Sequence, residues 1–189
     1  MEIFWSELRG AESAVPRREG RSKSPGSAFA WSLLAFAVRT VWGCGLPDTA
    51  VLPGGKPYFP GREDMHFSLS HTKSAVMVAV SSCRVGADVE TRRDAVRPAL
   101  EKSVFSVPHG DLDLFELWTL RESWFKLTGR GDLRSIPFSR TEGVITGPEP
   151  GLYARLYDEI PGCAAAVCSF DEAPPARIHR VELNAISLA

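Results

Sequence analysis

The sequence predicts an α+β protein with two pseudo-symmetric halves, each an antiparallel sheet packed with helices. Two observations lead to this class. Short apolar, strand-like segments fall into two groups along the chain, and each group accompanies a longer segment with apolar residues at helical spacing. At 189 residues the chain can hold one sizeable domain or two small halves. We place the halves at residues 1–92 and 93–189, without an internal sequence repeat to support the duplication.

The composition is typical of a soluble globular protein. Hydrophobic residues make up 44% of the chain and charged residues 24%, and a net charge of −1 argues against broad nucleic-acid binding. No apolar run reaches the length of a membrane span, and the N-terminus has no signal-peptide pattern. We therefore expect a cytoplasmic location, with no membrane and no nucleic acid as partner. The four cysteines form no CxxC pair, which argues against a zinc site.

The first half begins with a predicted short strand over residues 1–8. Residues 9–26 are rich in charge, Pro, Gly and Ser and are typical of a loop. The basic residues of this loop fit a solvated segment, which we favour, or an edge that contacts phosphate. Four of them are Arg17, Arg18, Arg21 and Lys23.

A helix is predicted over residues 27–42, because apolar residues recur there at helical spacing and Ser27 is suited to cap it. Gly43 and Gly45 are expected to end this helix. The Pro/Gly-rich connection over residues 47–62 is too irregular for a regular element, and long ordered loops are often functional.

Three strands are predicted next, in an arrangement that resembles an antiparallel hairpin. They cover residues 66–71, the β-branched run 74–81 and residues 85–90. Successive side chains alternate between the two faces of a strand, so Asp88 and Glu90 share a face at the end of the third strand.

The second half is predicted to start with a helix over residues 94–104 and an interruption at 106–110. A long helix follows over residues 112–127, and then a loop over 129–137. The last strands are expected at residues 143–146, 152–158, 163–170 and 178–183.

The long helix carries the pattern that connects fold with chemistry. Residues three and four apart share a helix face. Leu117, Leu120, Trp124 and Leu127 therefore lie opposite a face formed by Phe115, Trp118, Glu122, Phe125 and Lys126. A carboxylate in a mostly aromatic stripe is costly without a cation or a metal. For this helix alone, an exposed ion pair between Glu122 and Lys126 is the better interpretation.

Two earlier acids, Asp88 and Glu90, favour a functional interpretation of Glu122 instead. Three carboxylates are hard oxygen ligands of the kind that Mg²⁺ uses together with substrate phosphates, and Mn²⁺ would suit the same set. Lys126 lies one turn after Glu122, where it could neutralise a phosphate held on that metal.

Three further polar residues are candidates for phosphate contacts. Arg121 points about 100° away from Glu122 on the helix, toward another phosphate or a structural partner. Ser70 and His71 add a hydroxyl and an imidazole just before the second strand of the group; a lone His is more often structural, but this pair accompanies three acids.

Four ordered segments resemble the 4′-phosphopantetheinyl transferases of the surfactin-synthetase-activating type. They are GKP at 55–57, HFSLSH at 66–71, VGADVE at 85–90 and WTLRESWFK at 118–126. The sequence PG at 161–162 followed by AAAVCSF is similar to the last core strand of the family. The resemblance covers about residues 55–170, and four ordered segments are far more specific than any one of them.

The resemblance implies an enzyme that transfers the 4′-phosphopantetheine arm of coenzyme A to a serine of an apo acyl or peptidyl carrier protein and releases 3′,5′-ADP. Such carriers serve fatty acid, polyketide or nonribosomal peptide biosynthesis. The implied Mg²⁺ ligands are Asp88, Glu90 and Glu122. The implied contacts with the co-substrate coenzyme A are Lys56, Pro57, Ser70, His71, Arg121 and Lys126, the last near the diphosphate. The family type also implies a pseudo-dimeric monomer, with the site inside one chain.

The chain departs from the family pattern at two positions. Arg121 stands where the family usually has Lys, which keeps the charge but changes the geometry. His109 stands where the family usually has a Glu general base. A His can accept the serine proton near neutral pH, but a plain loop residue fits equally well, and Asp111 and Asp113 are reserve candidates.

The first half looks short for the family, and Arg39 is a candidate for the basic coenzyme A contact expected there. Val104 and Phe105 fit either a carrier-docking surface or the core. Two other functions stay open. The chain could be a degenerate relative that binds coenzyme A or a carrier without efficient catalysis, or another Mg²⁺-dependent phosphate enzyme. A nuclease of the D…ExK kind fits poorly, because Glu122 and Lys126 have helical spacing.

Overall fold

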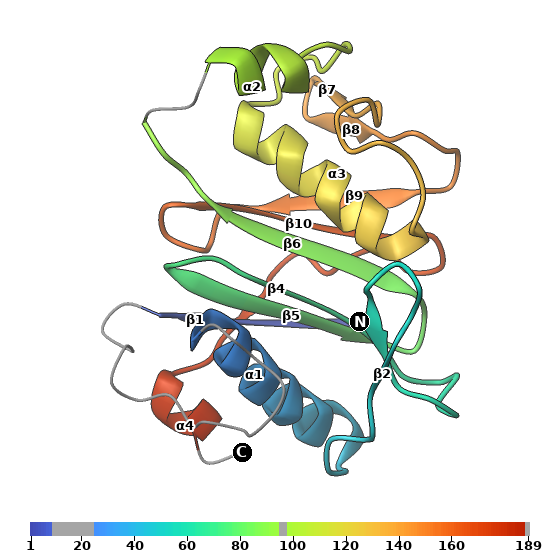
Figure 1. Ribbon diagram of the computed structural model, residues 1–189, viewed down its shortest axis with the longest axis vertical. Helices are drawn as coiled ribbons and strands as arrows, with labels where there is room; N and C mark the ends of the chain where they lie inside the picture. Colours follow the sequence, from blue (N-terminus) through green and yellow to red (C-terminus); the bar gives the residue numbers. More distant parts are fainter. Residues whose placement is uncertain (9–24, 95–97, 188–189) are drawn as a thin grey trace.

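The computed structural model describes residues 1–8, 25–94 and 98–187 (Figure 1). The expected α+β class is confirmed: two mainly antiparallel sheets lie between two long helices. The predicted basic loop residues Arg17, Arg18, Arg21 and Lys23 lie outside the described residues. Within the described part, no helix is long and apolar enough to cross a membrane.

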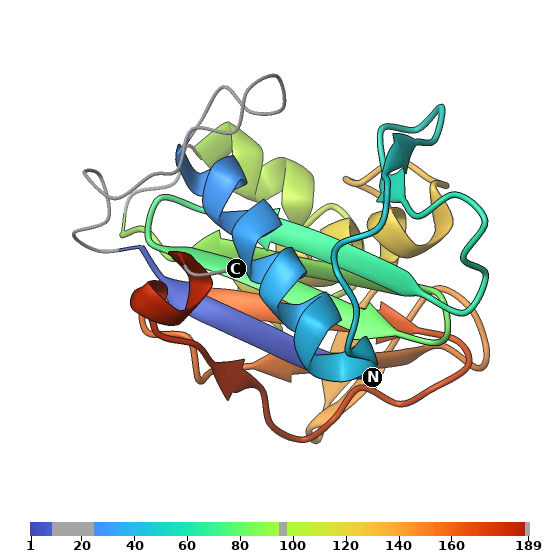
Figure 2. The ribbon, with the colours of Figure 1, turned by 90° about the horizontal axis from the view of Figure 1, so that it is seen from below.

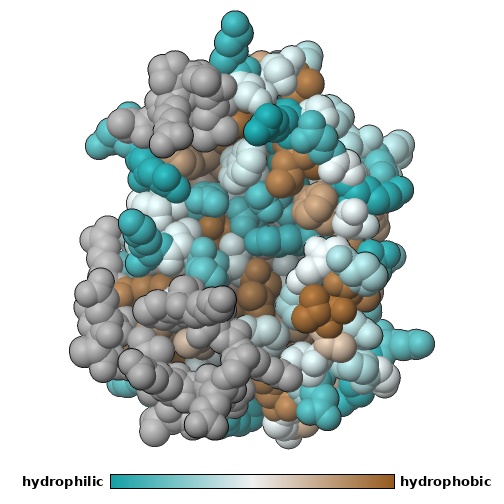
Figure 3. Space-filling view, in the orientation of Figure 1, coloured by the Kyte–Doolittle hydropathy of each residue, from teal (hydrophilic) through white to brown (hydrophobic). Residues whose placement is uncertain are grey.

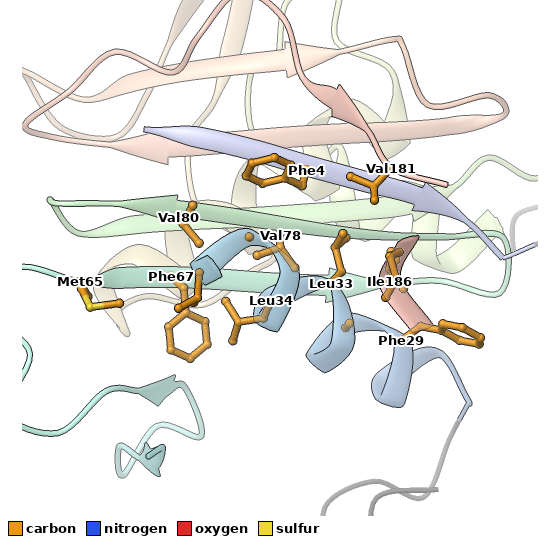
Figure 4. Packing of buried hydrophobic residues seen from close by; sticks show 14 of the residues in the cluster. Phe4, Phe29, Leu33, Leu34, Met65, Phe67, Val78, Val80, Val181 and Ile186 are labelled. Atoms are coloured by element: carbon orange, nitrogen blue, oxygen red, sulfur yellow. The ribbon is translucent and has the colours of Figure 1, made fainter. Parts of the chain in front are cut away.

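The first sheet has the strand order β11-β1-β5-β4. Its strands are β1 (Glu2–Glu7), β4 (His66–His71), β5 (Ala75–Ser81) and β11 (His179–Arg180), and only the β1–β11 pair is parallel. Helix α1 (Pro25–Trp42) and the short helix α4 (Leu183–Ser187) cover its outer face. Figure 4 shows Leu33 and Leu34 of α1 facing the strands that carry Phe67, Val78 and Val80, with Phe29 beside Ile186 of α4.

The second sheet has the order β6-β10-β9. It contains β6 (Val85–Thr91), β9 (Tyr153–Tyr157) and β10 (Cys163–Ser169), all antiparallel. Helix α3 (Leu114–Thr128) covers its outer face, and α2 (Pro98–Val104) packs at the start of α3. A separate apolar cluster, with Trp5, Met77, Val89 and Val167 among its members, fills the space between the sheets. The molecule is therefore layered as helix, sheet, sheet, helix, which explains why β5 and β10 are buried along their whole length.

The two halves repeat one topology. In the first half a strand (β1), a helix (α1) and a hairpin (β4–β5) give the sheet order β1-β5-β4. In the second half β6, α3 and the hairpin β9–β10 give β6-β10-β9 in the same way. The duplication that the sequence does not reveal as a repeat is therefore visible in the chain path.

The predicted hairpin arrangement is right for one pair of strands and wrong for the other. β4 and β5 pair antiparallel, from His66 opposite Ser81 to His71 opposite Val76. β6 leaves that sheet and pairs with β10, with Asp88 opposite Ala166. A boundary after residue 92 therefore separates β6 from its own sheet, and the repeat instead divides the chain between β5 and β6.

Smaller differences concern short elements. The connection over residues 47–62 contains a two-stranded ribbon, β2 (Ala50–Val51) and β3 (Pro57–Tyr58), which projects from the body of the molecule in Figure 2. The strands β7 (Ser139–Thr141) and β8 (Val144–Thr146) form a second small ribbon, of which only β8 was predicted. Helix α1 begins two residues before the expected cap Ser27, with Pro25 in its first turn, where proline is favoured.

Helix α3 has clear ends. Asp113 is its N-cap, and its side chain accepts the backbone N–H groups of Phe115 and Glu116 while Glu116 accepts the Asp113 N–H, which forms a capping box. Gly129 ends the helix in the left-handed conformation with φ 69°. The helix therefore starts two residues later than expected, and its buried face contains Leu117, Leu120, Trp124 and Leu127, which the helical spacing groups on one side.

Candidate active site

The site forms where α3 lies on β6. A Cβ placed on Gly86 would be 1.9 Å from the carbonyl oxygen of Ser123, so only glycine allows this close approach of helix and strand. Asp88 follows two residues later on β6 and is 4% exposed. Glu122 and Lys126 reach the same region from α3, and both are half-buried.

Asp88 joins three elements. Its Oδ1 accepts hydrogen bonds from Ser70 Oγ of β4 and from Lys126 Nζ of α3, each at 2.7 Å. Its Oδ2 is buried and has no hydrogen-bond partner among the described residues. A buried carboxylate oxygen without a partner is costly, and a cation would satisfy it.

The three predicted acids influence one another. Burial first, and then the charge of Asp88, raise the pKa of Glu122. Burial, Asp88 and Glu122 also raise the pKa of Glu90, while Arg93 and Lys126 oppose them. The charge of Asp88 contributes to both shifts, because a nearby like charge favours the protonated form. Lys126 forms its ion pair with Asp88, and the simple Glu122–Lys126 pair is absent from the described ion pairs.

These acids suit a divalent cation by chemistry, although they are not closed around one in this conformation. No group of three His, Cys, Asp or Glu side chains in the described ranges is arranged to hold a metal ion. The unpartnered Oδ2 of Asp88 and the all-oxygen donor set nevertheless fit Mg²⁺. The ammonium of Lys126 currently occupies one side of Asp88.

A pocket of about 460 Å³ lies beside the acids. It brings together residues from four distant segments of the sequence, among them Lys56, Pro57, Arg84, Glu122 and Lys126. The predicted residues Lys56, Pro57, Glu122 and Lys126 therefore share one cavity. Figure 3 shows a hydrophilic band across the middle of this face, between the two halves.

Lys56 lies in an unusual environment for a lysine. Its Nζ donates to the carbonyl oxygen of Val85 at 2.7 Å. Burial, together with the charges of Arg84 and Lys126, lowers its pKa to about 8. A half-buried cation that is bonded to a carbonyl and repelled by two other cations favours an anionic ligand.

Ser70 and His71 have different positions. Ser70 is buried and holds Asp88, so its observed role is to orient a carboxylate. His71 lies at the end of β4, open to solvent on one side, and the partial burial of its ring, followed by the charge of Lys126, lowers its pKa. Ser68, two residues before Ser70, accepts the N–H of Ala87 at 2.9 Å and so joins the edge strands of the two sheets.

The structure corrects the predicted role of Arg121. Its side chain is 0% exposed. Its Nε donates to Ile136 O at 2.8 Å and its Nη1 to Val104 O at 2.7 Å. The predicted contact with coenzyme A therefore does not hold in this structure, and the structural alternative accounts for the residue.

His109 and its reserve candidates lie in the segment before α3. His109 is half-buried, stacks on Phe105 at 4.3 Å between ring centroids, and is not among the pocket residues. Asp111 pairs with Arg140 at 2.6 Å, and Asp113 caps α3 and pairs with Arg92. The two aspartates thus have structural partners, which argues against either as the base.

The remaining candidates are placed as follows. Arg39 is exposed near the end of α1 and does not line the pocket. Val104 is 1% exposed and belongs to the core, whereas Phe105 is half-buried.

Arg84 lines the pocket but was not predicted, because it stands one residue before the VGADVE segment. Its signal in the sequence is only a lone basic residue in a turn before two acids.

Acids and lysines around one cavity, held between two halves of a duplicated α+β fold, define a site suited to phosphate esters and a divalent cation. No protein-family model matches the chain. Among curated proteins it is similar to a 4′-phosphopantetheinyl transferase of Bacillus subtilis, with 28% identity over 136 residues, 61% of this chain and 59% of the relative. The 4′-phosphopantetheinyl transferase psf-1 of Bacillus pumilus is 31% identical over 63% of this chain and 54% of its own length.

A third relative, the 4′-phosphopantetheinyl transferase Sfp of Bacillus subtilis strain 168, is 27% identical over 135 residues. These similarities confirm the resemblance to 4′-phosphopantetheinyl transferases of this type. The chain spans less than two thirds of the length of these relatives.

Proposed function

We propose that the chain transfers the 4′-phosphopantetheine arm of coenzyme A to a serine of an apo acyl or peptidyl carrier protein. The observation that carries this proposal is that Glu122, Lys126 and Lys56 line one cavity, while buried Asp88 lies behind it and accepts a hydrogen bond from Lys126. The relatives, by name, are transferases of this group. The proposed products are the holo carrier and 3′,5′-ADP.

The acids Asp88, Glu90 and Glu122 are the proposed ligands of Mg²⁺. The bound ion would supply charge neutralisation of the diphosphate. Lys126, which donates to Asp88, would stand beside the bound ion and could give a further donor to a phosphate oxygen, because one ammonium can donate in several directions. Lys56 and Lys126 then offset the negative charge that the phosphates bring into the pocket.

The reaction forms a bond between the carrier serine oxygen and the β-phosphorus of coenzyme A. The bond from that phosphorus to the bridging oxygen breaks, and 3′,5′-ADP leaves with the oxygen. The serine proton goes to a general base, for which His109 stays the candidate from the sequence. Most of the rate then comes from positioning and electrostatics.

The test uses the full chain, Mg²⁺, fluorescent coenzyme A and a panel of apo carrier proteins. Mg²⁺-dependent labelling of at least one carrier, abolished by Asp88→Ala, is the expected result. Preserved coenzyme A binding without labelling of any carrier would instead favour a degenerate relative that binds without catalysis. This is the second candidate function, because the three acids do not form a closed cluster among the described residues. Turnover of other phosphate esters without carrier labelling would favour another Mg²⁺-dependent enzyme.

The general base and the oligomeric state are tested by separate measurements. An unchanged rate across pH in His109→Ala would remove this residue as the base. The proposed pseudo-dimeric monomer, with the whole site in one chain, predicts a monomer mass by light scattering, and an obligate trimer would contradict it.

A further inference from the structure

Arg84 occupies a place in the pocket that the acid and lysine motifs do not account for. It is the last turn residue before β6, its side chain is exposed, and it lines the cavity. Its Nη2 donates to the carbonyl oxygen of Leu127, in the last turn of α3, at 2.9 Å. A carbonyl is a weak partner for a guanidinium, which has donors left for an incoming anion.

The charge around Arg84 is not balanced. Among the described ion pairs, neither Arg84 nor Lys56 contacts an acid, whereas Lys126 pairs with Asp88. The positive charge of Arg84 is also felt at Lys56, where it helps to lower the pKa. This part of the pocket therefore has two cations bonded only to backbone carbonyls in the described structure, beside one that is already paired.

Arg84 and the acid of α3 lie at different levels along the helix. Arg84 donates to Leu127, five residues beyond Glu122 on α3, which corresponds to about 7.5 Å of helix rise. A ligand with a single phosphate next to the acids and Lys126 would leave Arg84 without an anion. A ligand with phosphate at two positions can satisfy both.

We infer that Arg84 is a specificity-determining residue that gives the pocket a second anion contact, so that nucleotides with phosphates at two positions bind better than monophosphates. This inference rests on the proposed function, in which the nucleotide part of coenzyme A occupies this pocket. The competing account is that Arg84 only caps the C-terminus of α3, where a cation is favourable for the helix itself.

Calorimetric titration with two matched nucleotides separates the accounts. Adenosine 3′,5′-bisphosphate and 5′-AMP differ only in the 3′-phosphate. Arg84→Gln should weaken the bisphosphate about 10-fold, the loss of one charge-assisted hydrogen bond, and 5′-AMP less than about 2-fold. Arg130→Gln is the control. This substitution removes the same charge next to the same helix end, but Arg130 does not line the pocket. It should change neither affinity.

A thermal melt of each variant completes the experiment. Arg84→Gln with a lower melting temperature and an unchanged bisphosphate preference would overturn the inference and leave Arg84 as a helix cap. Arg84→Lys, which keeps the charge, should retain most of the preference, and a loss equal to that of Arg84→Gln would also overturn it. Failure of the proposed function gives a different result: the wild type then neither labels a carrier nor binds either nucleotide.

Discussion

Lys126 donates a hydrogen bond to Asp88 at 2.7 Å, from helix α3 to strand β6. Asp88 is almost fully buried, so this ammonium and the Ser70 hydroxyl are its described partners. Burial of a carboxylate without its cation costs several kcal/mol, while a neutral residue in its place avoids that cost. The pair is therefore both a part of the site and a part of the fold.

The first prediction concerns this pair. Lys126→Met should lower the free energy of unfolding by about 2–4 kcal/mol, because it leaves Asp88 charged and buried. Adding Asp88→Asn should recover part of that loss, with a coupling energy of about 1–3 kcal/mol in urea unfolding. Strictly additive effects of the two substitutions would contradict the interaction.

The second prediction concerns Glu122. Burial and the charge of Asp88 raise its pKa in the folded protein. Its contribution to stability is therefore most favourable at acidic pH and is lost as the pH rises through the raised value. Glu122→Gln should raise the melting temperature at pH 7 by about 1–3 °C while it abolishes carrier labelling.

Glu116→Gln is the matched control for Glu122→Gln on the same helix. Glu116 accepts the N–H of Asp113 in the capping box and pairs with Arg140 at 3.0 Å. The same substitution should therefore lower the melting temperature there. A lower melting temperature in both variants would show that the charge of Glu122 does not destabilise the folded protein.

The third prediction concerns Lys56, whose pKa is lowered to about 8 by burial and by Arg84 and Lys126. Only the protonated amine attracts phosphate, so the affinity for adenosine 3′,5′-bisphosphate should fall about 10-fold between pH 7 and pH 9. Folding has the opposite dependence: because the folded pKa is the lower one, this group adds stability as the pH rises from about 8 toward 10.5. Titration calorimetry at the two pH values measures the first effect.

Lys56→Met should bind the nucleotide weakly and without this pH dependence. Lys73→Met is the control, since Lys73 is an exposed lysine that does not line the pocket. A pH profile in Lys56→Met identical to that of the wild type would assign the dependence to another group.

The local elements were predictable because their signals are local. β4, β5, β10 and α3 follow from alternation, β-branched runs and helical spacing, and the buried face of α3 is the apolar one. The partner of β6 was not predictable in this way. A short turn after β5 is typical of a hairpin, yet β6 pairs with β10, about 75 residues later, and Ala87 and Val89 lie in the apolar cluster between the two sheets.

The site was predicted in part for the same reason. Acids and lysines were found because oxygen ligands and cations point to phosphate chemistry in any order of the chain. Helical spacing predicts the side of α3 on which Arg121 lies. It does not predict that the side chain donates there to Val104 O and Ile136 O. Arg84 was missed because its relevance depends on the cavity, which exists only after β6, α3 and the β2–β3 ribbon have come together.

The fourth prediction concerns Gly86. An added Cβ would meet Ser123 O at 1.9 Å and Leu127 N at 2.7 Å, both backbone atoms that cannot move aside cheaply. Gly86→Ala should therefore cost about 3 kcal/mol or more in urea unfolding and should move α3 away from Asp88. Gly45→Ala is the control, because a Cβ there meets nothing within 4 Å, and a small effect at both positions would contradict the close packing.

The fifth prediction separates structure from ligand binding at Arg121. The guanidinium joins the end of α2 at Val104 to the turn at Ile136, and its Nη2 is buried without a partner in the described structure. Arg121→Met removes two buried hydrogen bonds to a charged group and leaves two carbonyls unpaired, so it should destabilise the protein by about 2–4 kcal/mol. Nucleotide affinity of the folded fraction should stay within about 2-fold of wild type, measured by calorimetry at low temperature. A 10-fold loss of affinity in Arg121→Lys, with the melting temperature preserved, would instead restore Arg121 as a ligand contact, because the lysine keeps the charge but not the planar fork of donors.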